Sequence, residues 1–99
     1  MYKIVFTKQA LKDLENLKKI GISNKAKVLV DVIRENPYKN PPRYEKLVGK
    51  LDGIFSRRIN IQHRLVYQVY EEIIMENNVE YQGTIKIIRM WTHYDDIRG

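Results

Sequence analysis

Two strands joined by a short turn are predicted by the stretch IFSRRINIQHRLVYQVY, residues 54–70. It is rich in β-branched and aromatic residues, which are typical of strands. Successive side chains of a strand point to opposite faces of the sheet. Arg57 is therefore expected to share a face with Ile59 and Ile61, whereas Arg58 shares the opposite, polar face with residues such as Ser56.

The second of these strands begins with Arg64. Its alternation puts Arg64 on one face and directs the other face toward a core, with Leu65, Tyr67 and Val69 pointing inward. If Arg64 shares its face with Arg58, two guanidinium groups meet on a shallow concave sheet surface. A guanidinium holds two phosphate oxygens at once and stays charged at physiological pH, which suits phosphate binding. Salt bridges between these arginines and nearby acids, Glu71, Glu72 or Asp52, are the alternative.

The N-terminal third of the chain predicts a short strand over residues 2–6 and then a helical hairpin. Thr7 is the expected N-cap of the first helix, and Gly21 is expected to end it. Ser23 or Asn24 is expected to cap the second helix. All three prolines of the chain follow that helix within one short loop, NPYKNPPR, which cannot continue a helix.

The C-terminal half predicts an antiparallel meander, with a polar turn at residues 76–78 and strands over residues 54–61, 64–75 and 79–90. The elements follow the order β-α-α-β-β-β. Together they indicate a single α+β domain over residues 1–99. We expect an antiparallel sheet of about four strands, with the N-terminal helical hairpin packed on one face.

The composition favours a small basic globular domain with a polyanionic partner. Eighteen Lys and Arg residues against twelve Asp and Glu residues give a formal charge of +6. The chain has no cysteine, which excludes disulfides, thiolate catalysis and cysteine-ligated zinc. Without an apolar stretch of about 20 residues or a signal-like N-terminus, we expect a cytoplasmic protein with no membrane partner.

Acid–base chemistry on RNA is the reaction class that the motifs leave open. Of the two histidines, His63 falls in the turn between two strands, where a structural or solvent-exposed role is the usual one. His93 lies in the aromatic run Trp91-Thr92-His93-Tyr94, and its imidazole is suited to proton transfer near neutral pH. No metal-ligand spacing, phosphate-binding loop or dinucleotide fingerprint occurs, so we expect neither a metal nor another cofactor.

Five motifs, in order along nearly the whole chain, carry a resemblance to a known family: Glu45-Lys46-Leu47, Leu51-Asp52-Gly53, Ser56-Arg57-Arg58-Ile59-Asn60, His63-Arg64-Leu65-Val66-Tyr67 and His93-Tyr94. The sequence resembles the YoeB (Txe) branch of the RelE/ParE toxin superfamily of type II toxin–antitoxin systems. The resemblance implies a RelE-like, microbial-RNase-type fold. It also implies a metal-independent endoribonuclease that cuts messenger RNA in the ribosomal A site and thereby inhibits translation.

The resemblance further assigns roles to individual residues. Glu45 would be the general base, Arg64 the group that stabilises the phosphate in the transition state, and His93 the general acid. Substrate contacts would come from Arg57, Arg58, Lys46, Lys50 and Tyr94. The implied protein partner is an antitoxin of the Phd/YefM type. Its acidic C-terminal segment would cover the surface around Arg58 and Arg64, since carboxylates pair well with guanidinium forks.

The sequence departs from the family pattern at three places. Val48 stands where a lysine is expected three residues after Glu45, which leaves Lys50 as the nearest replacement. The chain also continues past Tyr94 by five residues, and the hairpin over residues 71–82 is longer than the pattern implies. Two other functions remain open, a noncatalytic RNA- or ribosome-binding domain and a ParE-like gyrase-inhibiting toxin. The cleavage preference and the choice between monomer and homodimer are open as well.

Overall fold

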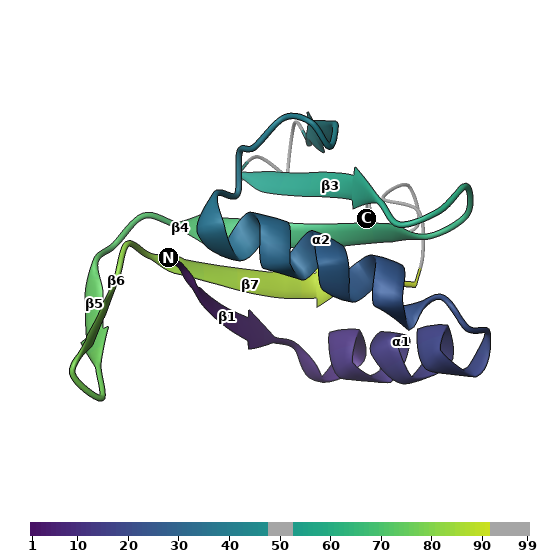
Figure 1. Cartoon of the computed structure of the whole chain (residues 1–99), viewed down its shortest axis with the longest axis horizontal. Coiled ribbons are helices and arrows are strands. Elements are labelled where there is room, and N and C mark those ends of the chain that lie inside the picture. Colours follow the sequence, from purple (N-terminus) through teal and green to yellow (C-terminus); the bar gives the residue numbers. More distant parts are fainter. Residues whose placement is uncertain (48–52, 92–99) are drawn as a thin grey trace.

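The structure is a computed structural model that describes residues 1–47 and 53–91 of the chain. Its elements, in chain order, are β1 (Lys3–Phe6), α1 (Lys8–Lys19), α2 (Ser23–Glu35), β2 (Tyr44–Lys46), β3 (Ile54–Arg58), β4 (Arg64–Tyr70), β5 (Ile74–Glu76), β6 (Val79–Tyr81) and β7 (Thr84–Arg89). The predicted α+β fold class is confirmed, with two N-terminal helices on one side of a sheet (Figure 1).

The main sheet has five strands in the order β1-β7-β4-β3-β2, one more than expected. It is mixed rather than purely antiparallel, because β1 runs parallel to its neighbour β7 while the other pairs are antiparallel. The additional strand, β2, contains Glu45 and lies where the sequence predicted no strand. A three-residue edge strand carries too little alternation to be seen in a sequence, and strand direction depends on pairing partners far away along the chain.

Each of the last two predicted strands is divided in two. β4 and β7 remain in the main sheet, while β5 and β6 form a separate two-stranded ribbon that projects from the body (Figure 1). The predicted turn is confirmed, since Asn77 and Asn78 have φ angles of 50° and 66°, a left-handed geometry that asparagine tolerates. Gly83 permits the return to the sheet, because a Cβ there would lie 2.1 Å from the carbonyl oxygen of Tyr70.

Both helices begin near the predicted residues. Thr7 caps α1 as expected, and its hydroxyl accepts a hydrogen bond of 3.0 Å from the backbone N–H of Ala10. The predicted cap of α2 is wrong, because Ser23 is already helical and Ile22 is the N-cap, without a side-chain hydrogen bond. Neither helix of the described chain is long and apolar enough to cross a membrane.

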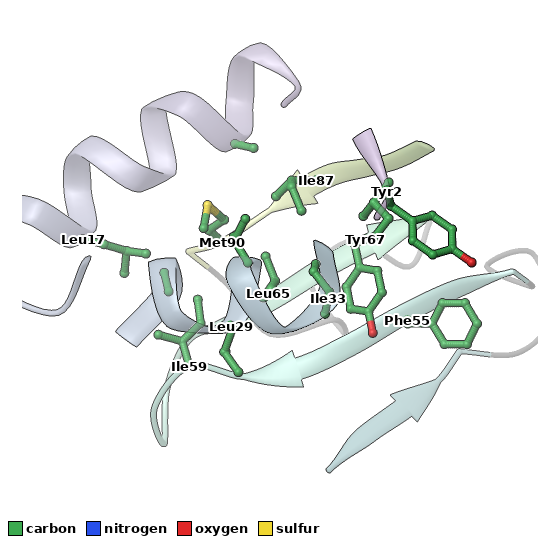
Figure 2. Packing of buried hydrophobic residues seen from close by; sticks show 14 residues of the cluster. Tyr2, Leu17, Leu29, Ile33, Phe55, Ile59, Leu65, Tyr67, Ile87 and Met90 are labelled. Carbon is green, nitrogen blue, oxygen red and sulfur yellow. The ribbon is translucent and has the colours of Figure 1, made fainter. Parts of the chain in front are cut away.

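The hydrophobic core lies between the helices and one face of the sheet (Figure 2). Leu17 and Ile33 from the two helices and Leu65, Tyr67 and Ile87 from the sheet are all fully buried. Because β4 alternates, burying Leu65 and Tyr67 on this face turns Arg64 to the opposite one. The core thereby fixes which face of the sheet is available for function.

Candidate functional site

A cleft of about 420 Å³ lies where β2, β3 and β4 meet. We call it the arginine cleft, and it is lined by Arg43, Tyr44, Glu45, Ser56, Arg58 and Arg64. Among the described residues, three guanidinium groups and one carboxylate line the cleft, which favours the binding of anions. The predicted meeting of Arg58 and Arg64 is confirmed, since the two residues lie directly opposite each other in the β3–β4 register.

The central contact of the cleft is the ion pair between Glu45 and Arg64. Arg64 Nη2 donates a hydrogen bond of 3.2 Å to Glu45 Oε1, and Nη1 donates one of 3.2 Å to the hydroxyl of Ser56. The Arg64 side chain is 11% exposed and that of Glu45 is 37% exposed. Arg64 is therefore held in a defined direction by the sheet, while the carboxylate remains accessible to a ligand.

Of the alternative salt-bridge partners for the arginines, Asp52 lies outside the described residues, and Glu71 is engaged elsewhere. Arg64 pairs with Glu45, and the Glu71 carboxylate accepts hydrogen bonds from the hydroxyls of Tyr2 and Tyr38. This shared carboxylate, together with burial as the largest cause, raises the pKa of both tyrosines. Glu71 thus joins the N-terminus, the proline-rich loop and the end of β4, away from the cleft lining.

Arg57 lies on the core face of β3, as the alternation predicted, and outside the cleft lining. It is 1% exposed. Its guanidinium donates hydrogen bonds to Tyr67 Oη at 3.1 Å, to the carbonyls of Pro37 and Lys39 at 3.1 and 2.8 Å, and to the carbonyl of Pro42. The structure therefore separates Arg57 from the other arginines and gives it a role in holding the loop that leads into β2.

The other candidate residues fall in two groups. Lys46 is exposed on β2 opposite Phe55, so alternation directs its side chain away from the face that carries Glu45. Lys50, His93 and Tyr94, like Val48 and Asp52, lie outside the described residues. Within the described ranges, no cluster of three or more His, Asp or Glu side chains is arranged to hold a metal ion.

The end of β7, which leads toward His93, is held by two side chains from other parts of the fold. Asp13 of α1 is fully buried and accepts hydrogen bonds from Arg89 Nε at 2.8 Å and from the backbone N–H of Met90 at 2.9 Å. His63 stacks on Trp91 with ring centroids 4.2 Å apart, and its Nδ1 contacts the Trp91 carbonyl oxygen. The structural role predicted for His63 is confirmed.

Sequence reasoning missed Arg43, which lines the cleft beside Glu45. The residue stands two positions before Glu45, and in extended backbone this spacing puts both side chains on the same face. That signal was available but depends on knowing that β2 is a strand. Sequence reasoning also missed Asp13, although Asp13 interrupts the apolar stripe of α1 between Ala10 and Leu17.

Solved structures share this fold. The YoeB/ParE toxin from Agrobacterium tumefaciens superposes with a TM-score of 0.77 at 26% identity, over 93% of this chain and 99% of that one. The toxin in the YoeB–YefM complex from Staphylococcus aureus gives a TM-score of 0.68 at 31% identity, over 95% and 99% of the two chains. The domain is thus a toxin fold of the RelE-like α+β type.

Sequence comparison identifies the toxin family to which the chain belongs. Residues 6–94 match the family model described as the YoeB-like toxin of bacterial type II toxin-antitoxin system. A toxin YoeB from Synechocystis sp. is 33% identical over 77 residues, which cover 74% of this chain and 87% of the relative. The chain belongs to the YoeB-like toxin family, as its motifs indicated.

Proposed function

We propose that this toxin is an endoribonuclease that cuts messenger RNA in the A site of the translating ribosome and thereby inhibits translation. The observation that carries the proposal is the Glu45–Arg64 pair, a carboxylate and a guanidinium 3.2 Å apart in a cleft with two further arginines. Membership of the YoeB-like family supports the choice of RNA over other polyanions.

The proposed reaction uses the RNA's own 2′-hydroxyl as the nucleophile. Glu45 takes the 2′-hydroxyl proton while the 2′-oxygen forms a bond to the adjacent phosphorus. Arg64 stabilises the negative charge that accumulates on the phosphoryl oxygens, so the chemistry requires no metal ion. The bond from phosphorus to the 5′-oxygen then breaks, and that oxygen receives a proton. The products carry a 2′,3′-cyclic phosphate, or the 3′-phosphate from its opening, and a 5′-hydroxyl.

His93 is the proposed donor of that last proton, with Tyr94 contacting or stacking on the substrate. Support comes from Trp91, two residues before His93 in the sequence, because Trp91 stacks on His63, the chain neighbour of Arg64. Arg58, on the open face beside Arg64, would hold phosphate, with Lys50 as an additional proposed contact. Lys46 is not included, because its side chain points away from the face that carries Glu45.

RNA end mapping after induced expression tests the proposal. We expect new 5′-hydroxyl ends within translated messages of cells that express the toxin, and none in cells that express the His93→Gln variant. A gyrase inhibitor would instead cause DNA damage and leave messages intact. A noncatalytic binding domain would retard RNA in a gel without producing new 5′-hydroxyl ends.

The proposed protein partner is an antitoxin of the Phd/YefM type, as in the Staphylococcus aureus YoeB–YefM complex. An acidic segment of the antitoxin would occupy the arginine cleft, because it offers carboxylates to a surface with excess positive charge. Reversing the charge with Arg58→Glu should weaken antitoxin binding at least tenfold, about 1.4 kcal/mol or more, in a calorimetric titration. Unchanged affinity would show that the antitoxin is held elsewhere.

A further inference from the structure

Three arginines line the arginine cleft, one on β3, one on β4 and one immediately before β2. Arg58 lies opposite Arg64 in the β3–β4 register. On the other side of β3, the β2–β3 register ends with Tyr44 opposite Arg57, and Arg43 and Arg58 are the residues next to this last pair. Adjacent strands are about 4.8 Å apart, and the three arginines therefore span the whole width of the cleft from β2 to β4. We call these three residues the arginine row.

Arg43 is presented to the cleft by a fixed backbone. Arg57 donates hydrogen bonds from the core to the carbonyls of Lys39 and Pro42, the latter being the residue immediately before Arg43. The side chain of Arg43 is itself exposed, and within residues 1–47 and 53–91 it makes no hydrogen bond or ion pair. Its guanidinium is therefore positioned at the cleft and available to a ligand.

The charges of the cleft favour an extended anion over a single small one. Glu45 is the one carboxylate that lines the cleft within the described chain, and it is already engaged by Arg64. Like charges that lie opposite each other across a sheet repel, so the juxtaposition of Arg58 and Arg64 in the β3–β4 register is electrostatically unfavourable. A ligand that carries negative charges at regular intervals along an extended chain relieves this repulsion at every position. Single-stranded nucleic acid has that character.

We propose that Arg43 binds the phosphate next to the one held at Arg64, so that the arginine row grips consecutive phosphates of a single RNA strand. This inference rests on the proposed ribonuclease function and adds a substrate-positioning residue to it. A contact to a phosphate that does not react contributes affinity without reading the base sequence. It stabilises ground state and transition state alike, so it affects KM rather than kcat.

The test measures binding of a short single-stranded RNA with 2′-O-methyl groups, which lacks the attacking hydroxyl, by fluorescence anisotropy over a series of salt concentrations. Each phosphate contact contributes about 0.7 to the slope of log K against log salt. Arg43→Ala should reduce that slope by about 0.7 and weaken binding about fivefold to tenfold at moderate salt. Arg43→Lys should restore most of the slope. In a ribosome-dependent cleavage assay, Arg43→Ala should raise KM and leave kcat unchanged.

Lys39→Ala is the matched control, because it removes one positive charge from the same loop at a side chain that does not line the cleft. If Arg43→Ala has the wild-type slope and affinity while Arg58→Ala and Arg64→Ala bind more weakly, the proposed role of Arg43 is overturned and the proposed function is not. Unchanged binding by all three arginine variants would refute the cleft as an RNA site and with it the proposed function. Equal losses of RNA affinity in Arg43→Ala and Lys39→Ala would show that only the net charge of the protein matters, and this result would also overturn the proposal.

Discussion

Replacing Arg64 with alanine is expected to lower the rate of ribosome-dependent message cleavage by about 10²- to 10³-fold, the usual cost of removing a preorganised charge from a transition state. The Arg64 side chain is 11% exposed and its guanidinium is directed by Ser56 and Glu45, so it needs little reorganisation when charge develops on the phosphate. Growth arrest on induction should disappear together with the cleavage.

The same substitution should leave the fold intact. Arg64 points away from the core that its neighbour Leu65 enters, and its partner Glu45 remains partly exposed to water when the arginine is gone. Because Arg64 is largely buried and donates hydrogen bonds to Glu45 and Ser56, we expect a loss of about 1–3 kcal/mol in the free energy of unfolding, which leaves the protein folded. Circular dichroism and urea denaturation measure this alongside the cleavage rate.

Two further variants sharpen the result. Arg64→Lys keeps the charge but offers no planar fork, so it should recover only part of the rate. Arg34→Ala is the control, because Arg34 forms an exposed pair with Asp31 on α2 and does not line the cleft. Its cleavage rate should equal that of the wild type. Full toxicity of a folded Arg64→Ala protein would contradict the proposed mechanism.

Strand alternation predicted from sequence which arginines share the open face of the sheet. Arg58 and Arg64 could be assigned correctly because the period of two is a local property of each strand and holds wherever the strand pairs. The contact between Arg64 and Glu45 could not be predicted from sequence. It depends on the pairing of β2 with β3, and the sequence around β2 shows no strand alternation. Only the family resemblance singled out Glu45.

Arg57 shows the limit of the resemblance. The motif Ser56-Arg57-Arg58 groups two adjacent arginines, yet the structure sends one into the core and the other to the cleft. Alternation did separate their faces. It could not show that the carbonyls of the proline-rich loop converge on Arg57, because those residues lie 15 to 20 positions away along the chain. Buried arginines without a partner acid are rare enough that no local signal predicts them.

Arg57 is therefore expected to be the residue whose loss destabilises the protein most. Within the described chain, its partners are three backbone carbonyls, the Tyr67 hydroxyl and the Tyr44 ring, which lies 4.9 Å from the guanidinium carbon. Burial raises the pKa of Tyr67, although the adjacent guanidinium opposes this, so the hydroxyl stays protonated and donates to the carbonyl of Pro37 at 2.7 Å. Removing the arginine deprives the partly buried carbonyls of Lys39 and Pro42 of this donor, while the Pro37 carbonyl keeps its hydrogen bond from Tyr67.

Arg57→Ala should lower the free energy of unfolding by about 3–5 kcal/mol, measured by urea denaturation, because it breaks a buried charged network and opens a cavity. Arg34→Ala, which breaks an exposed helical pair, should cost about 0.5 kcal/mol or less. Arg57→Lys keeps the charge and part of the volume, so it is the variant to use if the alanine protein does not fold.

Arg57→Lys also separates a role in global stability from a role in shaping the cleft. A single ammonium group cannot hold the carbonyls of Pro37, Lys39 and Pro42 together, so the loop that carries Arg43 into the cleft should loosen before the core does. Amide hydrogen exchange should accelerate in residues 37–46 while Leu65 and Ile87 in the core stay protected. Binding of the 2′-O-methyl RNA should weaken in parallel, although Arg57 does not line the cleft. Uniform acceleration across the sheet, or a loss of stability below about 1 kcal/mol in Arg57→Ala, would contradict this role for Arg57.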